Sequence, residues 1–237
     1  LMTFAEFIKA SRMSDEQILK RVKIEGRDIF DKALEEKKGV VVITGHIGNW
    51  EYIASYFGIK GYNPSVIVRP LDNPKLDAYM KSWREKRGVK CIARKGNLKD
   101  IFYTLRENKA VAFLCDQNYI DGIYVDFFGE KCATAVGPIA VAMKTKAPIV
   151  IMYDVPDRYG HHKIVVSEMM HIEEKETKEE KGPSQRRSVI TEIPSVEHRV
   201  ITMHGRSDNC RVNQSEVRRV GRKFVEVRRE CNEEGDV

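Results

Sequence analysis

The stretch GVVVITGHIGNWEYIASYFG, residues 39 to 58, decides the fold of this chain. Its apolar run Val40 to Ile43 is continuous, as expected of a strand that is covered on both faces. The spacing then changes, because residues 50 to 57 follow a helical pattern, and a glycine-rich turn separates the two. A strand, a tight turn and a helix in this order predict one unit of a parallel sheet, with the turn at the carboxyl end of the strand, where ligands bind.

His46 lies in that turn. A neutral imidazole can accept a proton from a hydroxyl near pH 7, and the carboxylate of Glu51 is suited to fix its tautomer. Gly45 and Gly48 permit the tight turn, and the helix that begins near Asn49 would direct free N–H groups at an oxyanion or a phosphate. On the residues alone, His46 fits a buried core histidine equally well, and Glu51 fits an ordinary first-turn carboxylate.

Strands and helices alternate along most of the chain. A capping box at Ser14 and Gln17 predicts a short helix with Ile18, Leu19 and Val22 on its inner side. Asn73 and Pro74 predict the cap and first residue of another helix. Further strands are expected over residues 65–68, 89–93, 110–115, 148–153 and 163–168, and further helices over 28–38, 74–87, 98–105 and 137–146. The prediction is an α/β fold with a mostly parallel central sheet flanked by helices.

Composition limits the function classes. A chain of 237 residues with 42% apolar residues can bury one sizeable core. The net charge of +6 favours anionic partners such as phosphate groups, anionic lipid surfaces, acidic carrier proteins or nucleic acid. Five scattered cysteines without a C-x-x-C pair indicate reduced thiols of a cytoplasmic compartment, not a disulfide framework or a zinc site. No apolar run approaches the roughly 20 residues that span a bilayer, and no signal peptide opens the chain.

Three segments are expected. Residues 1–38 form an N-terminal helical segment, residues 39–181 a catalytic domain, and residues 182–237 a divergent Arg-rich tail. In the tail lysine gives way to arginine, and leucine and tryptophan are absent. This composition predicts weak order, with valines able to form a strand or two. A second hypothesis is that a frame error changed lysine codons into arginine codons. The amphipathic pattern at the very start of the chain suggests that a segment upstream is missing.

The sequence HIGNWE, residues 46 to 51, resembles the H-x4-D/E signature of the glycerolipid and lysophospholipid acyltransferase superfamily. Its form is typical of the bacterial lipid A biosynthesis acyltransferases, the lauroyl and myristoyl transferases. The resemblance runs from about residue 4 to residue 181 and implies a glycerolipid acyltransferase-like fold. Further motifs match in order: VRPLDNP (68–74), WREKRGV (83–89), FLCDQN (113–118), VDFFGEKCAT (125–134) and GPIAVAMKTKAPIV (137–150).

The resemblance implies transfer of a fatty acyl group from an acyl carrier protein thioester, or a coenzyme A thioester, to a hydroxyl of a lipid A precursor glycolipid. It makes His46 the general base and Glu51 the residue that orients it. Direct attack on an activated thioester asks for no metal, no other cofactor and no covalent intermediate. Glycerol phosphate, a lysophospholipid or a mannolipid are the alternative acceptors, because the superfamily shares the histidine and the acidic residue.

Two arginines match family motifs and could hold a phosphate in bidentate fashion, Arg69 after a strand and Arg84 on a helix. The alternative for Arg84 is an ordinary solvated helix residue. Asp116 and Gln117 follow another strand and are expected in the same crevice, although Asp116 also suits a turn. The other residues expected to bind substrate are Gly48, Asn49, Phe128 and Thr134. Phe128 would wall an acyl-chain groove, although aromatic pairs more often belong to a core.

No metal site is expected, because the aspartates at 116, 121 and 126 lack the pattern of a calcium loop. The family usually carries an N-terminal membrane anchor and a Trp- and Arg-rich C-terminal segment, and this sequence resembles neither. We expect binding to an acyl carrier protein and to an anionic membrane surface, at the cytoplasmic face of the inner membrane, peripherally or through a missing N-terminal segment. Two rivals are an inactive fragment and a basic binding protein, but the tail lacks the interleaved aromatics of nucleic-acid binding.

Overall fold

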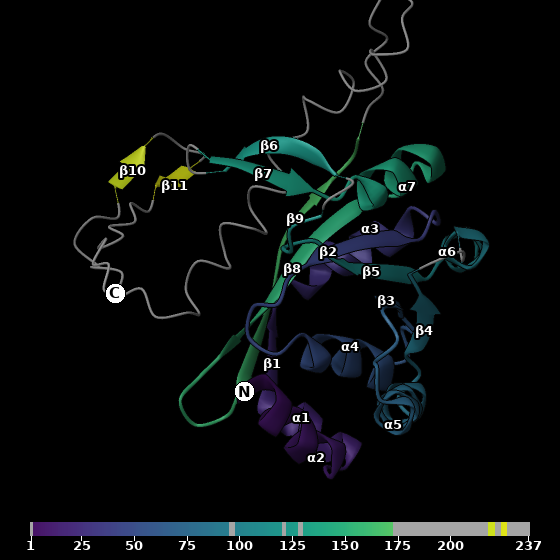
Figure 1. The fold of residues 1–237 in the computed structure, drawn as a ribbon, viewed down its shortest axis with the longest axis vertical. Coiled ribbons are helices and arrows are strands. Elements are labelled where there is room, and N and C mark those ends of the chain that lie inside the picture. The colour runs from purple at the N-terminus through teal and green to yellow at the C-terminus, as the bar shows by residue number, and fades with distance from the viewer. Residues whose placement is uncertain are drawn as a thin grey trace, which may run out of the picture.

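A seven-stranded sheet forms the centre of the molecule in a computed structural model (Figure 1). The structure describes residues 2–94, 98–119, 122–127 and 130–172, and two short strands at 218–220 and 224–226. The strands of the sheet are β1 (Val22–Glu25), β2 (Val40–Thr44), β3 (Ser65–Val68), β4 (Lys90–Ala93), β5 (Ala110–Leu114), β8 (Ile149–Pro156) and β9 (His162–Met170). The helices are α1 (Met2–Ser11), α2 (Asp15–Arg21), α3 (Arg27–Glu35), α4 (Trp50–Ile59), α5 (Pro74–Glu85), α6 (Leu98–Arg106) and α7 (Gly137–Thr145).

The strand order is β1-β9-β8-β2-β5-β3-β4, and all neighbouring pairs except β8 and β9 are parallel. The predicted mostly parallel sheet is therefore confirmed. Strands β8 and β9 are antiparallel because a short turn joins them directly, whereas a parallel pair needs a crossover connection. This turn brings residues 157–161 to the edge of the sheet where β2 ends.

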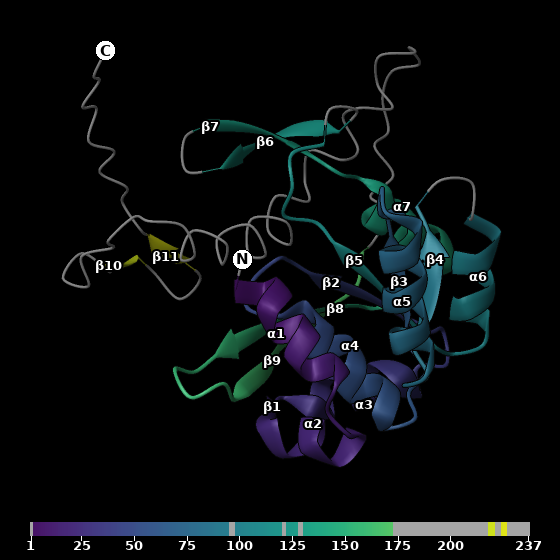
Figure 2. The same cartoon turned by 60° about the horizontal axis from the view of Figure 1, so that its bottom comes forward.

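Strand β2 is buried along its whole length because helices cover both faces of the sheet. Its side chains alternate between the faces, as the two-residue period of a strand requires. Val40 and Val42 pack into a core with residues of α1 to α5, whereas Val41 and Ile43 pack into a second core with residues of α6 and α7. Figure 2 shows α1, α4 and α5 together on one side of the sheet. The continuous apolar run of the sequence therefore reflects two separate cores.

Local sequence signals fix the starts of three helices. Ser14 and Gln17 form the predicted capping box of α2. Asn73 caps α5, whose first residue is Pro74, and Asn49 caps α4. In each case a side-chain oxygen accepts at least one of the backbone N–H groups that a helix start leaves without an internal partner, and Asn73 accepts two.

The structure differs from the sequence expectation at Val22. This residue ends the helical turn of α2 and begins β1, which pairs with β9 at the edge of the main sheet. The segment 1–38 therefore contributes a strand as well as helices. Val22 and Ile24 alternate with polar residues, which suits a half-buried edge strand better than the stripe of a helix.

The sequence did not assign the segment around YVDFFG. It forms a hairpin of β6 (Ile123–Phe127) and β7 (Glu130–Thr134) that projects beyond the sheet (Figure 1). In the tail, β10 (Arg218–Val220) and β11 (Phe224–Glu226) pair antiparallel, as the valines suggested. The rest of the tail, with the expectations of weak order and a frame error, lies outside the described residues. Within the described part of the chain, no helix has both the length and the apolar character needed to span a bilayer.

Candidate active site

His46 follows β2 at the edge of the sheet where the parallel strands end. Strand β5 pairs with β2 in register, so that Thr44 lies opposite Leu114, and the backbone N–H of Cys115 donates to the carbonyl of Thr44 (3.0 Å). The backbone segments that follow β2 and β5 therefore leave the sheet side by side. His46 lies two residues after Thr44 and Asp116 two residues after Leu114, and their side chains meet.

Two hydrogen bonds join His46 to Asp116. The backbone N–H of His46 donates to Oδ2 of Asp116 (2.6 Å), and ring Nδ1 lies 2.7 Å from Oδ1. A carboxylate accepts, so Nδ1 carries the proton and Nε2 is left as the basic nitrogen of the neutral ring. The Asp116 side chain is fully buried, whereas 26% of the His46 side chain is exposed. Asp116 thus holds the ring from the interior, while part of the His46 side chain remains exposed to solvent.

Neighbouring residues define the surroundings of the ring. Nε2 of Gln117 lies 3.4 Å from Nε2 of His46, and the ring of Trp50 packs edge to face against the imidazole with 4.4 Å between centroids. At Gly45 a Cβ atom would lie 2.9 Å from Oδ2 of Asp116, so a side chain there would press on the carboxylate. The glycine before His46 therefore lets Asp116 approach.

The prediction that Glu51 orients His46 is wrong. Both carboxylate oxygens of Glu51 bind Arg84 instead, Oε2 through Nε (3.0 Å) and Oε1 through Nη2 (2.5 Å). The side chain of Glu51 leaves α4 toward α5, whereas Asp116 comes from the strand beside β2 and faces the ring. An aspartate directly after a strand was the available sequence signal for this partner. Only the pairing of β2 with β5 could have shown that it reaches His46.

The prediction for Arg84 also needs correction. Its Nε and Nη2 groups bind Glu51, and its side chain is mostly buried, so it is neither a solvated helix residue nor placed to bind a phosphate. Burial alone would lower the pKa of the Arg84 guanidinium, but the hydrogen bonds and the charge of Glu51 outweigh burial and raise that pKa above its ordinary value. Burial raises the pKa of the neighbouring Cys91 thiol, and the guanidinium of Arg84 opposes this shift. Arg84 stabilises the carboxylate of α4 and is not open to a substrate phosphate.

Arg69 keeps its predicted place. It follows β3 at the same edge of the sheet as His46, its side chain is exposed, and it forms no ion pair within the described residues. Its binding of a substrate phosphate stays a prediction.

The turn between β2 and α4 differs from the expected anion site. The backbone N–H of Asn49 donates to Asp154, that of Glu51 to the Asn49 side chain, and that of Tyr52 to the Asn49 carbonyl. These three amides of the helix start are therefore not free for an oxyanion, contrary to the sequence expectation. Gly48 adopts a positive φ of 60°, as its role in a tight turn required.

Of the two remaining residues expected to bind substrate, the structure describes Thr134, which lies on the β6–β7 hairpin. The backbone N–H of Tyr119 donates to the carbonyl of Ala133 (2.9 Å), which ties the loop after Asp116 to β7. Thr134, the next residue of β7, is buried, and its hydroxyl lies 3.3 Å from the carbonyl of Cys132. Phe128, the expected wall of an acyl-chain groove, lies outside the described residues.

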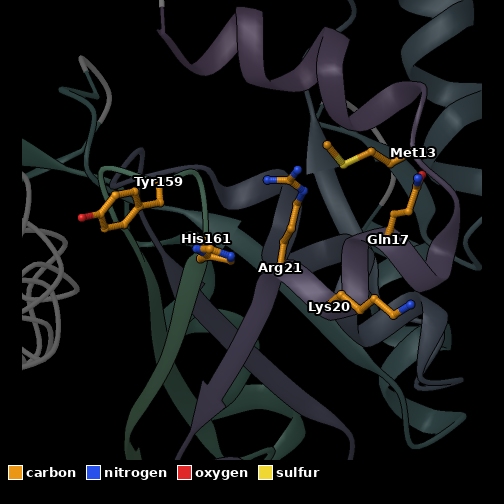
Figure 3. Close-up of a pocket in the computed structure, with 6 residues that line it drawn as sticks. All are labelled: Met13, Gln17, Lys20, Arg21, Tyr159 and His161. Carbon is orange, nitrogen blue, oxygen red and sulfur yellow. The ribbon is translucent and has the colours of Figure 1, made fainter.

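Two surface hollows lie near the turn-bearing edge of the sheet. One, of about 720 Å³, is lined by residues 72 to 75 in the loop between β3 and α5. The other, of about 460 Å³, lies between α2 and the turn that joins β8 to β9 (Figure 3). Its lining includes the cations Lys20 and Arg21 on one side and Tyr159 and His161 on the other. Arg21 bridges the two sides through a hydrogen bond to the carbonyl of Gly160 (3.2 Å).

Comparison with known proteins decides the family. Residues 1–189 match the family model of bacterial lipid A biosynthesis acyltransferases. This chain belongs to that family. The matched region contains the whole main sheet, His46 and Asp116, so the arrangement described above lies within the part of the chain that carries the family signal.

The sequence identity between this protein and individual relatives is low. A phosphatidylinositol mannoside acyltransferase of Mycobacterium tuberculosis is 28% identical over 131 residues, which are 53% of this chain and 42% of the relative. That of Mycolicibacterium smegmatis is 27% identical over 123 residues, 49% of this chain and 40% of the relative. A lipid A biosynthesis acyltransferase of Haemophilus influenzae is 26% identical over 144 residues, 59% of this chain and 45% of the relative. The chain thus spans less than half the length of these relatives.

Proposed function

We propose that this protein transfers a fatty acyl group from a thioester of acyl carrier protein or coenzyme A to a hydroxyl of a glycolipid, with His46 as general base. The observation that carries the proposal is the bond from Nδ1 of His46 to the buried carboxylate of Asp116. It leaves Nε2 as the proton acceptor. Family membership supports the acyl-transfer chemistry.

The reaction that this geometry supports is a direct attack. Nε2 of His46 takes the proton of the acceptor hydroxyl while its oxygen bonds to the thioester carbonyl carbon. The carbon–sulfur bond then breaks, and the thiolate leaves with the proton that the imidazolium returns. Asp116 stabilises the imidazolium between the two proton transfers, as a buried aspartate does for a catalytic histidine in other acyl-transfer enzymes.

The oxyanion that forms on the thioester carbonyl needs donors. The amides of Ile47 and Gly48 are candidates, because they make no hydrogen bond within the part of the chain that the structure describes, whereas the amide of Asn49 is occupied. Preformed backbone donors are effective here, since they cost no reorganisation during the reaction.

The acceptor is a glycolipid with anionic groups. Arg69, exposed after β3 at the same edge of the sheet, would hold a phosphate of its headgroup. Two acceptor classes follow from the relatives, since one named relative acts on a phosphatidylinositol mannoside and another in lipid A biosynthesis. We favour a lipid A precursor, because the family match covers most of the chain. The mannolipid is the alternative. Acyl carrier protein as donor and the cytoplasmic face of the inner membrane as the place of action belong to the same proposal.

The test is incubation of the purified protein with acyl carrier protein thioesters and, in parallel, with a lipid A precursor, a mannolipid, glycerol phosphate and a lysophospholipid. Mass spectrometry of the lipid products then reports acceptor and chain length together. We expect an acylated glycolipid, and loss of at least about 100-fold in rate in His46→Ala. Transfer that His46→Ala lowers by less than about tenfold would contradict the role of His46, and absence of any acylated product would contradict the function itself.

A further inference from the structure

A second buried carboxylate holds the turn of His46 from the side opposite Asp116. Strand β8 is the other neighbour of β2 in the sheet, and the side chain of its residue Asp154 is fully buried. Oδ2 of Asp154 accepts the backbone N–H of Asn49 (2.8 Å). The turn is therefore bound at both ends by strands that flank β2, through Asp116 at His46 and through Asp154 at Asn49.

The contact between Asp154 and the turn is close. A Cβ atom at Gly48 would lie 2.5 Å from the carbonyl oxygen of Asp154 and 2.6 Å from Oδ2. No side chain fits at Gly48 while Asp154 keeps its place. Because the backbone of the turn lies directly on this residue, a shift of the carboxylate would move the turn.

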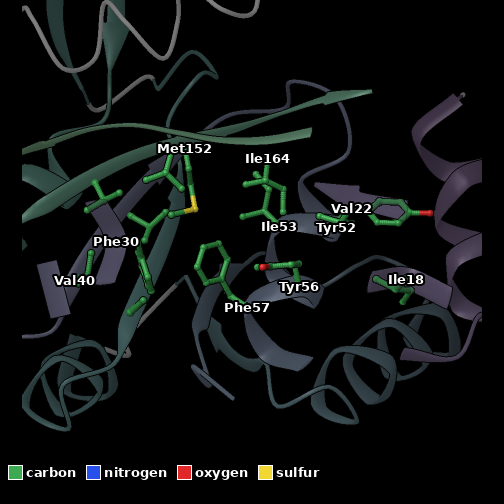
Figure 4. Packing of buried hydrophobic residues seen from close by; sticks show 14 of the residues in the cluster. Ile18, Val22, Phe30, Val40, Tyr52, Ile53, Tyr56, Phe57, Met152 and Ile164 are labelled. Atoms are coloured by element: carbon green, nitrogen blue, oxygen red, sulfur yellow. The ribbon is translucent and has the colours of Figure 1, made fainter. Parts of the chain in front are cut away.

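His162 of β9 holds the side chain of Asp154 in position. Nδ1 of His162 lies 2.7 Å from Oδ2 of Asp154, and the His162 side chain is 1% exposed. Its ring stacks on Tyr52 of α4, with 3.8 Å between centroids and 16° between planes. Figure 4 shows Tyr52 in the same apolar core as Ile164, two residues beyond His162. The histidine thus joins β9, β8 and α4.

A buried carboxylate is costly unless donors satisfy it. Within the described residues, Oδ1 of Asp154 is buried without a hydrogen-bond partner, so both donors of this carboxylate bind Oδ2. Removal of the imidazole donor would leave the amide of Asn49 alone. With only one donor left, burial of the Asp154 carboxylate would become less favourable, and its side chain would be expected to rotate toward other donors or solvent.

We propose that Asp154 and His162 are positioning residues for acyl transfer, which hold the turn that presents His46. The inference rests on the proposed role of His46. The pair acts through the backbone of Gly48 and Asn49, and a displacement of about 1 Å at a reacting group can cost about 100-fold in rate.

The experiment compares two substitutions of one residue. His162→Phe keeps a ring to stack on Tyr52 but removes the donor, whereas His162→Asn keeps a donor near the position of Nδ1 and removes the ring. His161→Phe is the matched control, because this adjacent histidine is exposed and pairs with Asp157 in the surface turn. Steady-state kinetics give kcat and KM separately. The hydrogen-exchange rate of the Asn49 backbone amide reports whether its hydrogen bond to Asp154 is kept, and this measurement does not require activity.

We expect His162→Phe to lower kcat by about 10- to 100-fold with KM changed by less than about threefold, and to speed exchange of the Asn49 amide by at least about tenfold. In His162→Asn, kcat and the protection of the Asn49 amide should lie between those of His162→Phe and the wild type. His161→Phe should change neither kcat nor this exchange rate. Unchanged exchange in folded His162→Phe would overturn the inference. If this variant does not fold, Asp154→Asn takes its place with the same readouts. Absence of transfer in the unsubstituted protein would overturn the proposed function, while exchange still decides whether the pair holds the turn.

Discussion

At the scale of single residues, Asp116 has two tasks that one carboxylate performs together. It fixes the start of the turn through the backbone of His46 and the tautomer of the ring through Nδ1. We expect Asp116→Asn to keep the fold but lower kcat by about 10²- to 10⁴-fold, because an amide can donate to the ring and favour the wrong tautomer. Kinetics with the acceptor identified by mass spectrometry measure this. Asp157→Asn, at an exposed aspartate that also pairs with a histidine, is the control and should retain activity.

The pair of Glu51 and Arg84 predicts a stability effect. Removal of one partner leaves a buried charge alone, so Glu51→Gln should lower the free energy of unfolding by about 3 to 5 kcal/mol. The double variant Glu51→Gln with Arg84→Met should recover much of this loss. Urea unfolding of the two single variants and the double variant gives the coupling energy. Asp28→Asn, which breaks the exposed pair with Lys32, should cost less than about 1 kcal/mol. Additive effects of the two buried substitutions would contradict the pairing.

The sequence could predict His46, because a histidine after an apolar strand is a local signal. It could not predict which carboxylate orients it. Glu51 is five residues away along the chain, whereas Asp116 is 70 residues away and becomes a neighbour only through the pairing of β2 with β5. For the same reason the sequence could not predict the pair of Asp154 and His162, because each residue lies in a strand whose neighbours in the sheet are not evident from local patterns.

At the scale of elements, close packing of α4 can be tested at Gly58. A Cβ atom there would lie 2.1 Å from the carbonyl oxygen of Arg87 and 2.8 Å from Cγ2 of Val89. Helix propensity alone predicts that Gly58→Ala stabilises the protein, but overpacking should instead destabilise it by about 1 to 3 kcal/mol. Thermal or urea unfolding measures the sign. Gly137→Ala is the control, since nothing lies within 4 Å of its Cβ position, and it should be neutral or slightly stabilising.

The contact between α3 and the loop after α4 predicts a dependence on pH. Burial, and next the hydrogen bond to Asp31, raise the pKa of Tyr62 to about 12 from an ordinary value of 10.0. The unfolded chain loses this proton first, so the stability that Tyr62 contributes is complete below about pH 10 and is lost as the pH rises to about 12. The difference in unfolding free energy between the wild type and Tyr62→Phe should therefore shrink between pH 9 and 11.5. A constant difference over that range would contradict the assignment.

Element prediction from sequence succeeded where a local signal exists. Ser65 to Val68 and the start of α5 at Pro74 were predicted to the residue, because a β-branched run and an Asn-Pro cap are unambiguous. Val22 was assigned to a helix, since a single valine after a helical stripe fits both patterns. It became a strand residue through pairing with β9, a contact that no local pattern contains.

At the scale of the whole molecule, exposed aromatic side chains lie at the edge that carries His46. Tyr124 on the β6–β7 hairpin and Tyr159 in the β8–β9 turn are each 67% exposed, and Arg158 lies against the ring of Tyr159. Exposed aromatic and basic groups together suit an anionic membrane surface. We expect flotation with anionic vesicles at low salt, reduced at least about threefold by Tyr124→Ser with Tyr159→Ser. Tyr103→Ser on α6, also exposed, should float like the wild type. A protein that stays at the bottom of the gradient would contradict membrane binding.

We expect Asp116, and not Glu51, to set the tautomer of the His46 ring. Nitrogen-15 NMR of the ring, at a pH high enough for the imidazole to be neutral, measures this directly through the shifts of Nδ1 and Nε2. We predict that Nδ1 carries the proton in the wild type and in folded Glu51→Gln, and that the proton moves toward Nε2 in Asp116→Asn. A wild-type ring protonated on Nε2, or a tautomer that changes in Glu51→Gln but not in Asp116→Asn, would contradict the account.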